Sequence, residues 1–399
     1  MTAAETAEQV ARNSYGRLLA ILASRTRDIA AAEDALAEAF VAALRAWAGG
    51  GVPANPDAWL LTAARHSISN SERHQRVRQA AQAELERRYE VSVVGNEAIP
   101  DERLKLLFVC AHPAIDASIR APLMLQTVLG LDAKRIAAAF LIAPATMGQR
   151  LVRAKAKIRD SGLRFEVARV DEMPSRLGDV LNAIYAAYGS DWDSLGENNV
   201  AGLNEEAIYL GRLLVSLMPE QAEARGLLAL MLYCEARRPA RRDAEGGFIP
   251  LQQQDAKLWC RDMIIEAEGE LTTASSFRSF GRFQCEAAIQ SVHVQRPITG
   301  VTNYQALRML YDLLLTHAPS VGAEVSRAVV ILESGDAAGA LKALEAIPES
   351  FTAEYQPFWI AKFHVLKALG LASADAALDR ALVLTQGEGL RRFLLALKP

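Results

Sequence analysis

The chain contains little cysteine: four residues among 399, spread far apart. No two of them form a C-x-x-C pair and no Cys and His spacing suits zinc, so we expect neither a metal site nor disulfides. The chain also lacks an apolar run of about 18 residues, which a membrane helix needs, and residues 1–19 have no apolar signal core. A cytoplasmic protein without a membrane partner is expected. The cysteines are Cys110, Cys234, Cys260 and Cys285.

Motifs typical of enzymes are absent from the sequence as well. It contains no G-x-S-x-G, no H-E-x-x-H and no glycine-rich phosphate-binding loop. His293, His317 and His364 are scattered, and His112 has no potential ligand partner nearby in the sequence. We therefore expect a protein that is not an enzyme, with no catalytic residues, no metal and no cofactor.

Alternating strand-like runs are scarce, whereas 51% of the residues are apolar, mostly Ala and Leu. Both are strong helix formers. The sequence therefore predicts an all-α protein, and its length is typical of about two to four domains.

Acidic and basic residues nearly balance over the whole chain, with a formal net charge of −3, but they are unevenly distributed. Up to Gly162 there are 21 Lys and Arg against 17 Asp and Glu, and from Leu163 onward there are 23 against 30. Residues 144–164 carry six basic side chains and one acidic side chain. This asymmetry predicts a nucleic-acid-binding N-terminal half and a protein-contacting C-terminal half.

The most basic segment, Arg135–Arg159, predicts two short helices around a tight turn. Pro144 stands where the second helix begins, at the position that tolerates proline best. At about 100° per residue, one stripe of that helix is apolar and another is polar and basic. The pattern is typical of a helix-turn-helix whose second helix enters the major groove. The apolar stripe is Met147, Leu151, Ala154 and Ile158, and the polar stripe is Thr146, Gln149, Arg150, Arg153 and Lys157.

Three further helices are predicted upstream, at residues 15–25, 31–47 and 57–76. The second has an apolar repeat and an acidic outer face that includes Glu33. Three glycines and two prolines at residues 49–56 predict a loop before the third helix. The apolar repeat of the second helix is Ala35, Leu36, Ala39, Phe40, Ala43, Leu44 and Trp47.

Two blocks, AEDALAEAF at residues 32–40 and NPDAWLLTAARHSISNSERH at residues 55–74, precede the helix-turn-helix. In this order and spacing, the two blocks and the helix-turn-helix together resemble an extracytoplasmic-function, or group IV, sigma factor of RNA polymerase. The resemblance implies sigma region 2 at residues 10–78, a linker at 79–99, sigma region 4 at 100–162 and a C-terminal helical regulatory extension at 163–399. The implied partners are promoter DNA and the clamp and flap regions of core RNA polymerase.

The resemblance also implies a role for individual side chains. Asp34 and Glu38 would bind the polymerase clamp. The −10 promoter element would be bound by Arg65, His66, Asn70, Arg73 and His74. The −35 element would be bound by Thr146, Gln149, Arg150, Arg153, Lys155 and Lys157, with Thr146, Lys155 and Lys157 mainly on phosphates. Two departures concern region 2: Ala37 stands where the family often has Gln, and residues 67–71 carry few charges.

The C-terminal part contains a faint repeat, in which Gly335 and Gly370 occupy matching turns 35 residues apart. This spacing is close to the tetratricopeptide period of about 34 residues. The extension resembles the tetratricopeptide-like domain of one sigma-factor subgroup, in which it regulates the sigma domains. An unidentified protein or small ligand is a further candidate partner there. The alternative function is a one-component DNA-binding regulator with a sensing tail.

Overall fold

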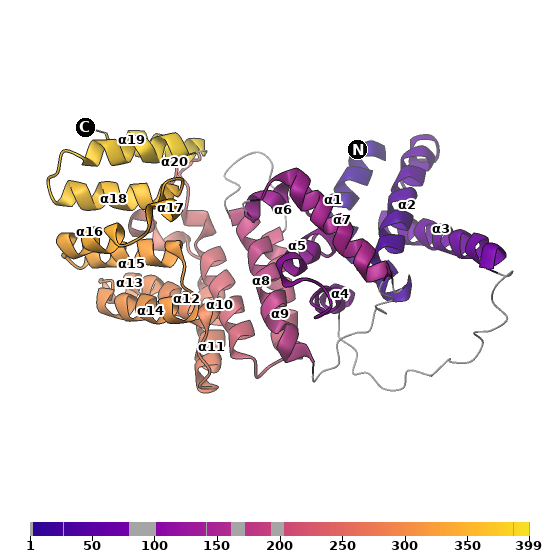
Figure 1. The fold of residues 1–399 in the computed structure, drawn as a ribbon, viewed down its shortest axis with the longest axis horizontal. Helices are drawn as coiled ribbons and strands as arrows, with labels where there is room; N and C mark the ends of the chain where they lie inside the picture. Colours follow the sequence, from indigo (N-terminus) through magenta and orange to yellow (C-terminus); the bar gives the residue numbers. More distant parts are fainter. Residues whose placement is uncertain are drawn as a thin grey trace. The chain divides into compact units, whose positions relative to one another are not determined.

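The computed structural model describes residues 3–26, 28–79, 101–140, 142–160, 172–192, 203–385 and 387–398. Within these ranges the chain is helical, with one isolated antiparallel bridge between Arg242 and Phe248 and no longer strand (Figure 1). The predicted all-α class is confirmed. No helix in these ranges has the length and apolarity to cross a membrane. The chain divides into two compact units, residues 1–193 with 198–213, and residues 194–197 with 214–399.

The first unit begins with three helices that pack on one another: α1 (Ala3–Thr26), α2 (Ile29–Gly50) and α3 (Pro56–Gln79). Asp28 caps α2 by accepting hydrogen bonds from the backbone N–H groups of the next turn, as an N-cap carboxylate does. The predicted loop was wrong at its start, because α2 continues through Gly49 and Gly50. The helix ends at Gly51, whose φ of 80° lies in the region that only glycine adopts readily.

Five further helices follow in the first unit: α4 (Glu102–Cys110), α5 (Ala117–Thr127), α6 (Ala133–Ala139), α7 (Pro144–Asp160) and α8 (Met173–Trp192). Helix α5 packs against α4, α6, α7 and α8, so it is the centre of this group. Leu123, Met124 and Leu125 on α5 are completely buried. Helix α7 packs on α5 and, more extensively, on α6.

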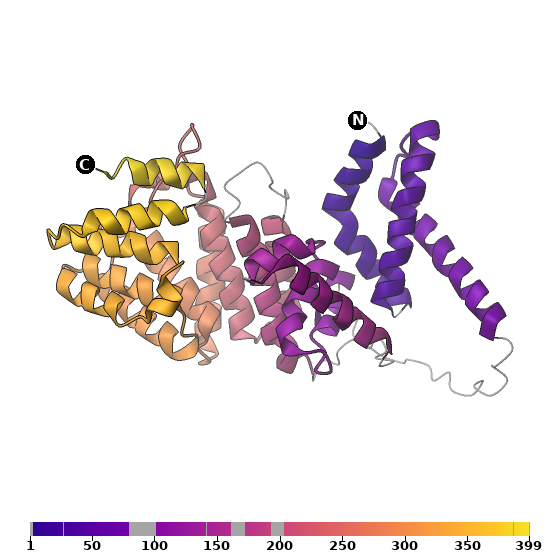
Figure 2. The same cartoon turned by 45° about the horizontal axis from the view of Figure 1, so that its top comes forward.

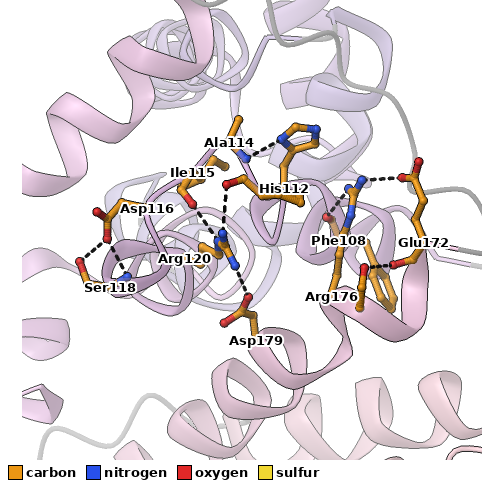
Figure 3. A network of polar contacts seen from close by, with 12 residues as sticks. Phe108, His112, Ala114, Ile115, Asp116, Ser118, Arg120, Glu172, Arg176 and Asp179 are labelled. Atoms are coloured by element: carbon orange, nitrogen blue, oxygen red, sulfur yellow. Dashed lines mark hydrogen bonds and ion pairs between the residues drawn. The ribbon is translucent and has the colours of Figure 1, made fainter.

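Two arginines anchor α8 to this group (Figure 3). The Arg120 guanidinium donates to Asp179 of α8 at 2.8 Å and to the carbonyl oxygen of Ile115 at 2.8 Å. Arg176 of α8 is buried and donates to the carbonyl oxygen of Phe108 at the end of α4, at 3.3 Å. Helix α8 is therefore an integral part of the α4–α7 group, although it follows the predicted region 4.

Helix α9 (Leu203–Leu217) contacts the beginning of α4 through charged side chains. Arg103 pairs with Asp101 at 2.9 Å and also with Glu206 of α9, and its guanidinium lies over the Tyr209 ring. The pKa of Asp101 is lowered because the hydrogen bonds from Arg103 outweigh the desolvation of the carboxylate.

The second unit consists of consecutive helices that pack on their neighbours (Figures 1 and 2). Gly335 and Gly370 have positive φ angles of 95° and 69° and end α15 and α18 in the same way. The α-helices after α9 are α10 (Ala222–Ala236), α11 (Arg261–Ser276), α12 (Arg282–Val294), α13 (Arg296–Thr299), α14 (Tyr304–His317), α15 (Val321–Glu333), α16 (Ala337–Glu345), α17 (Glu349–Thr352), α18 (Gln356–Ala368), α19 (Ala374–Leu384) and α20 (Glu388–Leu395). Short 3₁₀ turns occur at Arg238–Ala240, Leu251–Gln253 and Ala256–Leu258.

Helices α10 and α12 lie very close together at Gly226. A Cβ atom at this position would lie 2.7 Å from the backbone nitrogen of Gln284. One turn earlier, the Glu223 carboxylate accepts hydrogen bonds from the N–H groups of Phe283 and Gln284 at 3.0 and 3.1 Å. It thereby satisfies donors that the first turn of α12 leaves unpaired. The two contacts fix the distance and register of α10 and α12.

Gly226→Ala should destabilise the protein by about 1–3 kcal/mol, because the new methyl group forces two helices apart. Gly269→Ala in α11 is the matched control, since nothing lies within 4 Å of a Cβ built there. The control should be neutral or stabilising by up to about 1 kcal/mol, because alanine favours helix. Denaturant unfolding followed by circular dichroism measures both. Equal stability of the two variants would contradict the close approach.

Candidate nucleic-acid interface

The corner between α6 and α7 is fixed by one side-chain cap and by the backbone. Asp132 accepts a hydrogen bond from the N–H of Arg135 at 2.8 Å and caps α6. The N–H of Ile142 donates to the carbonyl oxygen of Ala137 at 2.9 Å, which turns the chain immediately after α6. Pro144 then occupies the first position of α7, where its missing N–H leaves no bond unmade.

Helix α7 has one buried face and one exposed face. The predicted apolar stripe is confirmed, because its four members are at most 8% exposed. The polar stripe lies on another side of the helix, because successive residues are about 100° apart, and this side is exposed. The buried members are Met147, Leu151, Ala154 and Ile158, and the exposed side carries Thr146, Gln149, Arg150, Arg153 and Lys157.

Lys155 differs from the other basic side chains that were predicted to bind DNA. Its side chain is only 17% exposed, and its Nζ lies 2.7 and 2.6 Å from the two carboxylate oxygens of Glu33 on α2. Sequence reasoning recognised Glu33 as part of an acidic face but missed this pairing. The partners are 122 residues apart, and no local spacing signals such a contact.

The acidic face of α2 carries both residues that were predicted to bind polymerase. Asp34 and Glu38 are exposed, and Glu38 accepts a hydrogen bond from the Ser67 hydroxyl of α3. Beside Glu38 lies a shallow groove of about 370 Å³, lined by Ala37, Glu38, Val41, Ala42 and Arg45.

One apolar residue of α2 was misassigned. Leu44 was expected in the core but is 46% exposed, and Val41 is 48% exposed next to it. Leu44 lies beyond the edge of the buried stripe that faces α1 and α3. This stripe consists of Ala32, Leu36, Ala39 and Ala43. The misassignment shows that an apolar residue adjoining a helical stripe need not be buried.

Helix α3 presents Arg65 and His66 to solvent. Its first turn is held against α1, because Asp57 accepts a hydrogen bond from the Ser14 hydroxyl at 3.0 Å and pairs with Arg17. The backbone of α3 continues to Gln79. The side chains of three predicted −10 contacts lie outside the described residues, as does most of the predicted linker. These contacts are Asn70, Arg73 and His74.

No group of three or more His, Cys, Asp or Glu side chains in the described ranges could hold a metal ion. The ring Nδ1 of His112 accepts a hydrogen bond from the N–H of Ala114 at 3.1 Å (Figure 3), which shapes the turn after α4. Cys110 is buried, and burial raises the pKa of its thiol to about 12, so it remains protonated at neutral pH.

Comparison with known proteins identifies two segments of the chain. Residues 11–78 match sigma-70 region 2, and residues 176–275 match a family of unknown function, DUF6596. The first match covers α2, α3 and most of α1, and the second begins within α8. No solved structure matches the chain.

A relative matches over nearly the whole length. An uncharacterized protein of Rhizobium meliloti (strain 1021) is 34% identical over 368 residues, which cover 90% of this chain and 87% of that protein. Sigma-70 region 2 belongs to a family of non-enzymatic transcription factors and implies binding to core RNA polymerase and promoter DNA. The chain therefore belongs to the family of this rhizobial protein and carries a sigma-70 region 2 domain at residues 11–78.

Proposed function

We propose that the chain is an alternative sigma factor of the extracytoplasmic-function class, which directs core RNA polymerase to specific promoters. The observation that carries the proposal is the sigma-70 region 2 domain followed, in the same chain, by a helix with an exposed basic face. A one-component regulator would have no use for a polymerase-binding domain, so the match favours the sigma factor over that alternative.

The proposed contacts follow the exposed faces. The acidic side of α2, with Asp34 and Glu38, binds the polymerase clamp. Helix α3 approaches the −10 element through Arg65 and His66. The α4–α7 group acts as region 4 and contacts the flap, and the exposed side of α7 enters the −35 major groove. Arg150 has a forked pair of N–H donors, and Gln149 has an amide donor and an amide acceptor, so both can pair with base edges there.

Regulation by the C-terminal helical domain is part of the proposal. The first helix after the predicted region 4 packs on it, because α8 contacts α4 and α5 through Arg176 and Asp179. In this proposal, a signal that acts on the C-terminal segment alters the α4–α7 group by way of α8.

Run-off transcription with core RNA polymerase tests the central claim. The template carries the DNA upstream of the protein's own gene. We expect a discrete transcript that depends on adding the chain, because a sigma factor supplies promoter recognition to the enzyme. Tight binding of the chain alone to a palindromic duplex, with no effect on polymerase, would instead support the one-component regulator.

Arg150→Ala should weaken binding of the polymerase complex to its promoter by about 1–3 kcal/mol, the usual contribution of one bidentate base contact. Arg308→Ala, which removes an exposed arginine from α14, controls for the general loss of positive charge. Gel-shift titration of the promoter and of a duplex with a scrambled −35 element separates the two effects. An equal loss of affinity for both duplexes would show that Arg150 contacts phosphates and not bases.

The anchoring of α8 predicts where the chain can be shortened. A fragment ending at residue 162 should be at least about 5 kcal/mol less stable than one ending at residue 192. It loses the buried Leu181, Ile184 and Tyr188 of α8, and each fully buried large apolar side chain contributes about 1.5–3 kcal/mol. Denaturant unfolding of both fragments measures the difference. Equal stability would show that α8 is dispensable for the α4–α7 group.

A further inference from the structure

The ion pair between Glu33 and Lys155 joins the helix proposed to bind polymerase to the helix proposed to read DNA. The Lys155 Nζ lies within 2.7 Å of both carboxylate oxygens, and the two side chains are 18% and 17% exposed. Because water has little access, their attraction is screened less than that of a typical surface pair.

The pair lies within a larger interface between α1–α2 and the α4–α7 group. Helix α1 packs against α4 and α5. At Gly16, α1 lies so close to the end of α5 that a Cβ atom built on this glycine would be 1.7 Å from the carbonyl oxygen of Val128. The neighbouring Tyr15 ring contacts Gly130, with 3.5 Å from a ring carbon to a Cβ built there. The two proposed binding modules are therefore in direct contact in the free chain.

This contact competes with the role proposed for Lys155. A lysine ammonium has three N–H donors, and Glu33 accepts from it through both of its oxygens. A DNA phosphate at the remaining N–H would lie close to a carboxylate of the same charge sign. The repulsion between the two anions weakens each contact when the other is present, so Glu33 and a phosphate compete for this ammonium.

We propose that the Glu33–Lys155 ion pair is a latch that keeps α7 against α2 in the free chain, and that DNA phosphates and Glu33 compete for Lys155. The inference rests on the proposed function, because it takes α7 to be the DNA-reading helix. Opening and DNA binding are then linked reciprocally: a ligand that opens the latch raises the affinity for DNA by the same factor by which DNA raises the affinity for that ligand.

The first test measures binding of the full-length chain to a random-sequence DNA duplex, since phosphate contacts do not depend on sequence. Glu33→Gln removes the competing charge and should tighten binding about fivefold. It should also steepen the slope of log K against log salt by about 0.9, because one more phosphate is neutralised. Adding Lys155→Gln to this variant should abolish the gain.

The matched control is Glu270→Gln. Glu270 of α11 pairs with Arg225 of α10, and both side chains are largely buried, so this variant removes a similar ion pair outside the interface between α1–α2 and the α4–α7 group. Its DNA affinity and salt slope should equal those of the unmodified chain. A similar gain in both variants would overturn the latch, because the effect would then come from net charge alone.

The second test detects the latch directly in the unmodified chain. A carbodiimide joins a carboxylate and an amine in contact, with loss of water, so it should produce an amide between Glu33 and Lys155. Saturating duplex DNA should reduce this product. Asp379 of α19 and Lys398, which follows α20, lie 2.6 Å apart and provide the internal control, because their product should not change. Peptide mass spectrometry quantifies both.

Gly16→Ala opens the interface without altering either latch residue. Alanine favours helix over glycine, so α1 itself is not weakened, but the added methyl group cannot fit against Val128. The variant should lose the Glu33–Lys155 product and gain DNA affinity. An unchanged product would overturn the closed arrangement.

The two proposals fail in different ways. If the chain gives no promoter-dependent transcript but the Glu33–Lys155 product forms and DNA reduces it, the sigma-factor assignment fails and the latch remains. If transcription depends on the chain but the product is absent while the Asp379–Lys398 product forms, the latch is wrong. A product that persists undiminished at saturating DNA would also overturn it.

Discussion

The burial of one side of α7 against α5 is the constraint on which the rest of the candidate interface depends. Met147 and Leu151 are almost inaccessible to water. Once this stripe is buried, the helical period sets which side chains lie on the opposite side of α7. The same α5 also supports α8, through the ion pair of Arg120 and Asp179. A single central helix thus fixes the orientation of the basic face and the attachment of the C-terminal segment.

The fold class and the main helices could be predicted from the sequence because their signals are local. Helical periodicity, the proline at the start of α7 and the acidic caps act within one or two turns of the chain. Helix ends were harder to predict. Glycine costs a helix only about 1 kcal/mol, so α2 can continue through the exposed Gly49 and Gly50 to Gly51, whose φ is positive.

Within the candidate site, only the division of α7 into a buried and an exposed face could be predicted from the sequence. The exposed stripe around Arg150 follows from periodicity, and the structure places it in solvent. The environments of Lys155 and Leu44 do not follow, since each depends on which other helix lies opposite. A lysine on a basic helix looks the same in the sequence whether it faces a phosphate or a glutamate 122 positions earlier.

The engagement of Lys155 by Glu33 has an evolutionary consequence. Under the proposed function and the proposed latch, position 155 contributes both to affinity for DNA and to the ease with which the two helical groups separate, so a substitution there alters both at once. Affinity for the promoter can then change through the exposed Gln149 or Arg153 alone, whereas a change at position 155 requires a compensating change at position 33. The two positions should therefore vary together among relatives of this chain.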